Sequence, residues 1–283
     1  MQKWRYLNAY IQGNGHKESN LPCQDYSYVF KHDEYVICVV CDGASAFKNS
    51  QIGAENVTKF ANHYFSDLIN TKKWYNEKET ITEKEWKEEA KETLYKIRNE
   101  LEEKFTTQGY SLESLSCTII VVIQLKNKLL VTHIGDGRAG YCNDNDEWFS
   151  MIKPCKGDYS NETVFITSNI WNDENSIDQY IESRIVEYVN LKAFCLLSDG
   201  CENASFECYK YDDELKTAFE INKPFKEFFH DNINNHLPKI IARGICEEEL
   251  NEIWAEFLRT GNETLQKEND DKSMILAFKI NKM

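Results

Sequence analysis

Short runs of apolar, mostly β-branched residues recur along the chain and predict β-strands. Polar segments bound these runs, and each run has the length of a strand rather than that of a long helix. The six runs are Tyr35–Cys41, Cys117–Leu125, Leu129–Ile134, Val164–Thr167, Ala193–Leu197 and Met274–Ile280. The second and third flank Lys126–Lys128, and this arrangement predicts a hairpin.

Other segments show the spacing of three and four residues that is typical of amphipathic helices. One apolar stripe runs from Val57 to Leu68, and a second runs from Trp86 to Phe105 among many Glu and Lys residues. Asp213–Phe229 and Glu247–Leu258 are also predicted to be helical. The strands and helices therefore come in blocks, which favours an α+β sandwich over regular βαβ winding.

Composition indicates one folded domain over residues 1–283. The 283 residues include only 4 prolines and no Gly/Ser-rich linker, and 41% hydrophobic residues can supply a substantial core. The net charge of −14 disfavours attraction to nucleic acid or to an anionic membrane, so we expect neither as a partner.

The pattern of apolar residues also bears on location and on the cysteines. Residues 1–20 lack the apolar core of a signal peptide, and the longest apolar run is too short to cross a membrane, so we expect a soluble cytoplasmic protein.

Most of the 10 cysteines lie singly in apolar runs, which predicts buried free thiols. Cys38 and Cys41 have CxxC spacing, but on a strand they would face opposite ways, which argues against a zinc or redox site.

Acidic residues stand at the ends of several predicted strands. Asp42-Gly43, Asp136-Gly137 and Asp199-Gly200 each directly follow an apolar run, and Asp270-Asp271 precedes the last one. A single Asp-Gly pair is most often just a turn. Carboxylates at several strand ends, however, can converge on one edge of a sheet, and an all-oxygen set of ligands favours magnesium, manganese or calcium over zinc. The sequence therefore predicts a site for hard cations.

Six short motifs resemble, in their order along the chain, those of the metal-dependent protein phosphatases of the 2C type. They are Pro22–Asp25, Val40–Ala44, Ser116–Thr118, Ile134–Tyr141, Leu197–Gly200 and Asp270–Leu276. Each motif is weak alone, but together they extend along nearly the whole chain. The resemblance implies a four-layer α-β-β-α sandwich in which helices flank two central antiparallel sheets.

The resemblance also implies how two Mn²⁺ or Mg²⁺ ions are held. By motif position, Asp42 bridges both ions and Gly43 offers its backbone carbonyl to one of them, while Asp199 and Asp270 complete the shell of the other. Asp270 is preferred to the adjacent Asp271 because the family ligand lies three residues before the Ser/Thr that opens the last strand. Asp42, Asp199 and Asp270 are therefore the predicted catalytic residues.

Three further residues have outer roles in the same comparison. Asp136 resembles the aspartate that helps to bind a third, looser ion in many members of the family. Gln24 and Asp25 fall where the family has an acidic or amide residue and an aspartate, which act mainly through metal-bound waters.

The chain departs from the family at the position that binds the substrate phosphate. The family usually has an arginine five residues before Asp25, and this chain has Asn20. Nearby His16 and Lys17 could donate to a phosphate oxygen instead, or they could be plain loop residues that face solvent. We therefore take His16 and Asn20 as the candidate substrate-binding positions. Ala44 stands where some members carry a histidine, as is common in bacterial-type members.

Two other polar residues are expected to be structural. His133 lies inside an apolar strand and is predicted to be a hydrogen-bonded core histidine rather than a ligand. Arg138 falls where the family has a structural arginine. The sequence leaves the roles of the segments Gly109–Ser116 and Asp144–Asn161 open, and both could shape the rim of the site.

The leading hypothesis is hydrolysis of phosphoserine and phosphothreonine on proteins by a water that two metal ions activate. The expected partners are a phosphoprotein substrate and a cognate protein kinase. A binding or sensing module with impaired catalysis is one alternative, motivated by Asn20. A phosphatase of small phosphorylated metabolites is the other, because it would share the same core chemistry.

Overall fold

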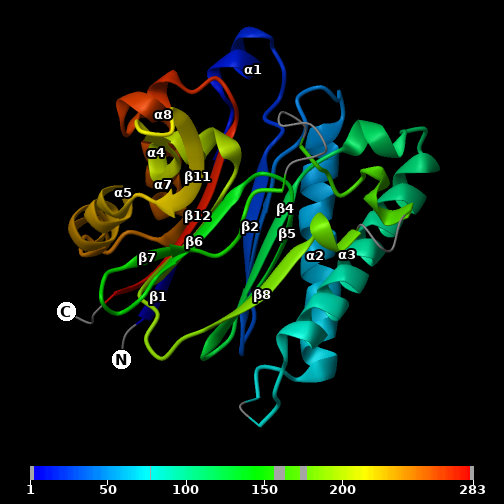
Figure 1. Cartoon of the computed structure of the whole chain (residues 1–283), viewed down its shortest axis with the longest axis horizontal. Helices are drawn as coiled ribbons and strands as arrows, with labels where there is room; N and C mark the ends of the chain where they lie inside the picture. The colour runs from blue at the N-terminus through cyan, green and yellow to red at the C-terminus, as the bar shows by residue number, and fades with distance from the viewer. Residues whose placement is uncertain (1–2, 77, 156–162, 173–176, 281–283) are drawn as a thin grey trace.

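Two five-stranded antiparallel sheets form the centre of the computed structural model, which describes residues 3–76, 78–155, 163–172 and 177–280 (Figure 1). The first sheet has the order β1-β12-β9-β6-β7, with bounds β1 (Lys3–Ile11), β12 (Lys272–Ile280), β9 (Ala193–Leu197), β6 (Arg138–Cys142) and β7 (Trp148–Ser150). The second has the order β2-β3-β4-β5-β8, with bounds β2 (Tyr26–Lys31), β3 (Val36–Cys41), β4 (Ile119–Gln124), β5 (Lys128–Ile134) and β8 (Glu182–Glu187). The predicted hairpin is confirmed as β4 and β5.

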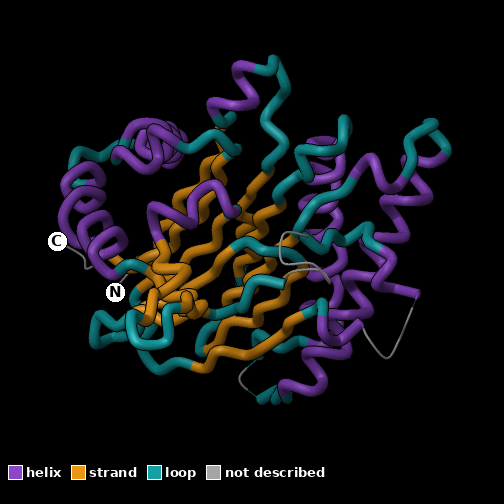
Figure 2. The backbone as a smooth tube through the Cα atoms, turned by 45° about the horizontal axis from the view of Figure 1, so that its top comes forward, coloured by secondary structure: helices purple, strands orange, loops and turns teal. Residues whose placement is uncertain are grey.

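Helices cover the outer face of each sheet, so that strands lie between two helical layers (Figure 2). The second sheet is covered by α2 (Ser50–Lys72) and α3 (Glu83–Thr106). The first is covered by α5 (Lys226–Asp231), the π-helical turn Asn232–His236, α6 (Leu237–Ile241) and α7 (Glu247–Thr260). Shorter helices are α1 (Asn14–Glu18), α4 (Glu202–Ser205) and α8 (Glu263–Lys267), and 3-10 turns occur at Leu112–Leu115, Asn169–Asn172, Ile177–Gln179 and Asp199–Cys201. The expected four-layer α+β sandwich is confirmed.

Three layers of apolar packing hold this arrangement together. One cluster lies between α2, α3 and the second sheet, where Trp86 is fully buried and donates its indole N–H to the Val131 carbonyl at 2.8 Å. A second lies under α5 to α7, where Trp254 donates to the Met274 carbonyl at 3.2 Å. The third fills the space between the sheets. Each tryptophan thus fixes a helix to a strand through both burial and a hydrogen bond.

The central strands are apolar on both faces because each face meets a packed layer. In β3, Cys38 belongs to the cluster between the sheets and Cys41 to the cluster under the helices. The two thiols therefore face opposite ways, as the strand geometry predicts. Burial raises the pKa of Cys38 and of Cys195 on β9, so these thiols act as small hydrophobic core residues rather than as nucleophiles.

Val164–Thr167, predicted as a strand, is instead a turn that leads into a 3-10 helix. Val164 and Ile166 are buried against the helical layer, which accounts for their apolar character. The turn is closed by a hydrogen bond from the Ser168 N–H to the Phe165 carbonyl at 3.0 Å. The prediction was wrong because a buried loop and a short strand can have the same apolar residues.

The helix predicted over Asp213–Phe229 is also wrong for most of its length. A two-stranded antiparallel hairpin of β10 (Phe206–Asp212) and β11 (Thr217–Pro224) occupies that region, and only α5 follows it. The Asp212 carboxylate accepts from the N–H groups of Glu214 and Leu215, each at 2.9 Å, and so fixes the turn. This local capping of the turn outweighs the helical propensity of the Glu- and Lys-containing segment.

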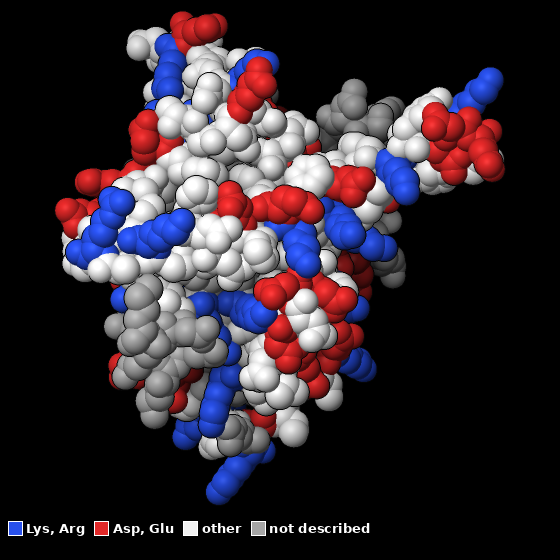
Figure 3. Space-filling view, turned by 90° about the vertical axis from the view of Figure 1, so that its left-hand side faces the viewer, with Lys and Arg blue, Asp and Glu red and all other residues white. Residues whose placement is uncertain are grey.

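The surface mixes charges of both signs. On the face shown in Figure 3, basic and acidic side chains are interspersed rather than gathered into a field of one sign. Among the helices in the described ranges, none combines the length and the apolar character that a membrane crossing requires.

Candidate metal centre

Four aspartates meet at one end of the two sheets because the strand register brings their neighbours together. Leu197 at the end of β9 pairs with both Met274 near the start of β12 and Arg138 at the start of β6. The residues that flank these pairs, Asp199, Asp270 and Asp136, therefore lie at the same edge, and Asp42 joins them from the end of β3. All four aspartates and Gly43 line one cavity of about 1030 Å³.

Asp42 is held in place by the neighbouring strand. Its backbone carbonyl accepts from the Thr118 N–H at 2.8 Å, and its own N–H donates to the Thr118 hydroxyl at 3.1 Å. The next residue, Gly43, has no room for a side chain, because a Cβ there would lie 2.5 Å from the Gln24 carbonyl oxygen. The Asp-Gly pair therefore brings its backbone close to the segment before β2, which explains why a glycine follows the aspartate.

The carboxylates repel one another and are partly withdrawn from water. Burial raises the pKa of Asp42 well above its usual range, and the charges of Asp25 and Asp199 add to this. Burial, with the charges of Asp136 and Asp270, raises the pKa of Asp199 to about 7. Burial likewise raises the pKa of Asp270. Such a group of carboxylates is destabilising when all are ionised, unless cations neutralise it.

The donor set fits hydrated hard cations. The Asp199 Oδ1 atom is buried, and none of the described residues donates a hydrogen bond to it, so this acceptor is available to a ligand. Within the described part of the chain, no three His, Cys, Asp or Glu side chains are grouped closely enough to hold one ion by themselves. Magnesium commonly binds through one or two carboxylates and keeps several waters, so the arrangement of Asp42, Asp199 and Asp270 suits it.

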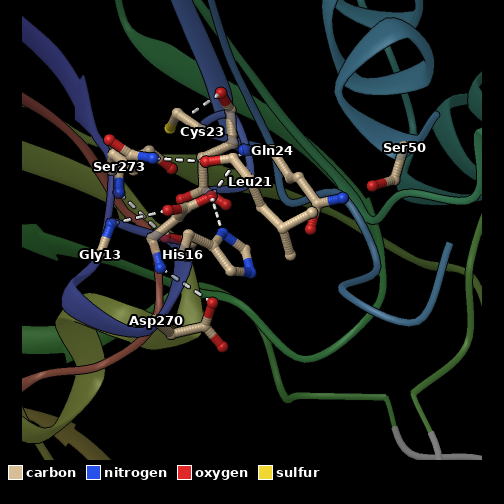
Figure 4. Close-up of polar contacts among 12 residues, drawn as sticks. Gly13, His16, Leu21, Cys23, Gln24, Ser50, Asp270 and Ser273 are labelled. Carbon is tan, nitrogen blue, oxygen red and sulfur yellow. Dashed lines mark hydrogen bonds and ion pairs between the residues drawn. The ribbon is translucent and has the colours of Figure 1, made fainter. Parts of the chain in front are cut away.

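The Asp271 carboxylate belongs to a buried network that ties the N-terminal segment to β12, and Figure 4 shows three of its partners, Gly13, His16 and Gln24. Its carboxylate accepts from the Gly13 N–H at 2.7 Å, from the Gln24 N–H at 2.5 Å and from His16 Nδ1 at 2.8 Å. Asp271 is 1% exposed and does not line the cavity, whereas Asp270 does. This division supports the choice of Asp270 as the ligand.

Comparison with known proteins identifies the family. The family model described as Protein phosphatase 2C matches residues 12–251. The chain belongs to the protein phosphatase 2C family. A sequence comparison with curated proteins finds no match.

Solved protein phosphatases share the fold at low sequence identity. The catalytic domain of the serine/threonine phosphatase PstP, in complex with two manganese ions, has a TM-score of 0.57 and 13% identity, with 99% of this chain and 100% of that chain covered. RsbX in complex with magnesium has a TM-score of 0.53 and 11% identity over 99% and 100% of the two chains. The S. agalactiae serine/threonine phosphatase has a TM-score of 0.55 and 11% identity over 98% and 99%.

Gln24 and Asp25, predicted to act through metal-bound waters, are buried beside the cavity that the aspartates line, but neither is among the described residues that line it. The Ser198 hydroxyl donates to Asp25 Oδ2 at 2.6 Å and accepts from the Ser273 N–H at 3.0 Å, so Ser198 joins Asp25 to β12. Sequence analysis did not single out Ser198, although it directly precedes Asp199.

The structure does not bring the two candidate substrate-binding residues to the cavity. His16 is buried, and its Nδ1 atom is engaged with Asp271. Asn20 is exposed, has a φ of 54°, and ends the turn after α1 by donating its N–H to the Lys17 carbonyl at 3.2 Å. Neither residue is among the described residues of the cavity lining.

Arg138 and His133 lie in the core of this protein phosphatase 2C fold. Arg138 is 2% exposed and donates to Glu202 at 2.9 Å and to Asn222 at 3.0 Å, which fixes the β10–β11 hairpin to β6. His133 is fully buried, and burial lowers its pKa. The backbone groups of Lys153 and Glu182 oppose this shift, although neither ring nitrogen has a partner at ordinary hydrogen-bond geometry among the described residues.

The rim includes hydroxyl residues to which the sequence analysis gave no role. The Thr163 hydroxyl donates to Asp136 Oδ2 at 2.6 Å, and the hydroxyls of Ser116 and Thr167 are 2.6 Å apart. Ser116 and Leu112, from the segment Gly109–Ser116, line the cavity as expected. In the segment Asp144–Asn161, β7 is an edge strand of the first sheet, while residues 156–161 lie outside the described residues.

Proposed function

We propose that the chain is a Mg²⁺- or Mn²⁺-dependent phosphatase that removes phosphate from phosphoserine and phosphothreonine in proteins. One observation carries the proposal: Asp42, Asp136, Asp199 and Asp270 line a single cavity in a chain of the protein phosphatase 2C family. The similar structures of PstP and RsbX were solved with manganese and with magnesium, respectively, which supports the same choice of ion here.

The residues have distinct parts in this proposal. Asp42 would help to hold both ions, together with the Gly43 carbonyl at one of them and with Asp199 and Asp270 at the other, and Asp136 would help to hold a third. Bound ions of this kind supply an activated water and neutralise charge on the phosphoryl oxygens. The chain's own contribution is to hold the carboxylates rigidly at strand ends, where backbone hydrogen bonds such as those of Asp42 with Thr118 limit their movement.

The decisive test is turnover of a phosphothreonine peptide by the purified protein with added Mn²⁺. We expect hydrolysis that EDTA removes and that Asp42→Asn lowers by about a thousandfold, the scale seen when one group that stabilises a transition state is deleted. Asp213→Asn is the matched control, because Asp213 is exposed in the turn between β10 and β11 and its replacement makes the same change in charge. No turnover with either metal would refute the proposal.

A binding module without turnover is the competing hypothesis. It is favoured because His16 and Asn20 are not among the described residues of the cavity lining, so neither takes the place of the phosphate-binding arginine of the family there. Phosphopeptide binding without release of phosphate would select this alternative. Comparable turnover of small phosphorylated metabolites would instead indicate a metabolite phosphatase.

The proposal also includes a cytoplasmic location and a protein kinase that generates the substrate.

A further inference from the structure

A basic side chain from α3 shares the cavity with the aspartates. Arg98 lines the cavity together with Glu102 from the same helix, while Asp42, Asp136 and Asp199 reach it from strand ends. Among the lining residues that the structure describes, Arg98 is the one Lys or Arg. The cavity therefore has an acidic wall formed by the sheets and a single cationic group contributed by the helical layer.

The Arg98 guanidinium is only partly satisfied by the protein. Its Nη1 atom donates to Glu102 Oε2 at 2.6 Å and to the Asn99 side-chain oxygen at 3.0 Å. Its Nε atom is buried and has no hydrogen-bond partner among the residues that the structure describes. A guanidinium can bind a phosphate or carboxylate through two parallel N–H groups, and a donor left without an acceptor favours a shift toward such a ligand.

The cavity is larger than one phosphoryl group requires. Its volume of about 1030 Å³ is at the upper end of the range for pockets that enclose whole ligands. Phe47, Val164 and Phe165 provide apolar lining, and Ser116 and Thr167 provide hydroxyl groups. This mixture suits a peptide segment whose side chains extend from the aspartates toward α3.

We infer that Arg98 binds a second anionic group of the substrate while the phosphate to be removed lies at the aspartates. The preferred substrate is then a segment with phosphoserine or phosphothreonine and, a few residues away, either an acidic or a second phosphorylated residue. This inference rests on the proposed function and specifies its substrate class. Glu102 holds the guanidinium when no substrate is present, and the incoming anion replaces it.

The test compares three phosphothreonine peptides that differ at one nearby position, where they carry alanine, glutamate or phosphoserine. With Mn²⁺ present, we expect kcat/KM to be about tenfold higher for the phosphoserine peptide than for the alanine peptide, which is the lower end for a charge-assisted hydrogen bond. The glutamate peptide shows whether a carboxylate is sufficient as the second anion. If kcat/KM rises only for the phosphoserine peptide, the second anion is a phosphate.

Substitutions assign the preference to Arg98. In Arg98→Gln the ratio of kcat/KM between the anionic and alanine peptides should fall to about one, whereas in Lys96→Gln it should stay as in the wild type. Lys96 is the matched control because it lies on the exposed side of α3, pairs with Glu92 at 2.7 Å and is not in the cavity lining. Glu102→Gln should raise the ratio, because the competing carboxylate is removed. A purely structural role of Arg98 would not produce these opposite effects.

The outcomes separate this inference from the proposed function. A wild-type ratio near one, or a ratio that Arg98→Gln leaves unchanged, overturns the inference even if turnover is high. If no peptide is hydrolysed, fluorescence anisotropy of the same labelled peptides with Mn²⁺ still tests it. About tenfold tighter binding of the phosphoserine peptide, lost in Arg98→Gln, would support the role of Arg98 even though the proposed function fails.

If Arg98→Gln does not fold, Arg98→Lys serves instead, because it keeps the charge but lacks the planar fork, and the ratio should still fall.

Discussion

Asp270 and Asp271 are neighbours in the chain, yet their carboxylates lie in opposite kinds of surroundings. Asp271 is almost fully buried and accepts hydrogen bonds from Gly13, Gln24 and His16. The Asp270 carboxylate faces a cavity that it shares with other aspartates, and burial raises its pKa. The Asp271 carboxylate thus stabilises the fold, whereas the carboxylate of the preceding residue, Asp270, is left available for a ligand.

The comparison shows that two adjacent residues, Asp270 and Asp271, can serve function and stability separately. The aspartates that line the cavity make the metal-free protein less stable, because their charges repel one another in a partly dehydrated site. The network around Asp271 offsets part of this cost by fixing the loop of residues 13–24 against the start of β12. Substitutions in the two regions should therefore affect different measurements, and the following predictions begin with the largest effect.

Asp270→Asn should lower kcat/KM for a phosphothreonine peptide by about a thousandfold, since a metal ligand in the proposed site is lost. Its free energy of unfolding in EDTA should be unchanged or slightly higher, because one repelling charge is removed. Turnover with Mn²⁺ and urea denaturation measure the two effects. Loss of stability without loss of turnover would reverse the roles assigned to the two aspartates.

Asp271→Asn should lower the free energy of unfolding by about 2 kcal/mol, because an amide nitrogen would then face backbone N–H donors in a buried site. Urea denaturation in EDTA measures this loss. Asp178→Asn is the control, since Asp178 is largely exposed and pairs with Lys91 at the surface. An Asp271→Asn protein as stable as the wild type would show that the network contributes nothing to stability.

The stability of the metal-free protein should fall as the pH rises toward neutrality. Burial and neighbouring charges raise the pKa of Asp199 from its ordinary value of 3.8 to about 7. Between these values the folded protein retains a proton that the unfolded chain has lost, so stability decreases from about pH 4 to about pH 7 and then levels off. We expect the thermal midpoint in EDTA to be about 3 °C lower at pH 8 than at pH 6.

Two additional samples test the cause of this pH dependence. Asp199→Asn should remove most of the difference between pH 6 and pH 8, and added Mn²⁺ should raise the midpoint of the wild type more at pH 8 than at pH 6. Differential scanning fluorimetry gives all the midpoints. A wild-type midpoint in EDTA that is equal or higher at pH 8 would contradict the repulsion.

His16→Gln should have the smallest effect, a loss of about 0.5 to 1 kcal/mol in the free energy of unfolding. Glutamine can still donate to Asp271, so only the packing and geometry of one of three hydrogen bonds change. Lys17→Gln is the control at the exposed neighbouring position. If His16→Gln instead removes turnover and leaves stability intact, His16 contacts the substrate after all.

The sequence predicts the buried strands well because both of their faces are covered. β3, β4, β9 and β12 therefore appear as continuous apolar runs. β1 and β2 are edge strands of their sheets, and polar residues such as Asn8 and Ser27 interrupt their apolar pattern. The β10–β11 hairpin is largely exposed, so it has almost no hydrophobic period from which its type could be inferred.

The site is predictable to the extent that its residues follow strands. The Asp-Gly pairs mark strand ends, and the register of antiparallel strands then brings them together. Ser198, Thr163 and Arg98 could not be found in this way, because their place at the site depends on how segments that are distant in the sequence pack together. The contact of Ser198 with Asp25, for example, joins residues 173 positions apart.

The pairing of β1 with β12 has a consequence for how the protein is made. β1 is an edge strand whose neighbour in the sheet is β12, so the strand near the start of the chain pairs with one near residue 280. During synthesis β1 must therefore remain without its sheet partner until residues 272–280 have left the ribosome. Asp271 and its partners Gly13 and Gln24 come together in the same step, so the candidate metal site, to which the neighbouring Asp270 belongs, is completed only after this last-paired segment has been made.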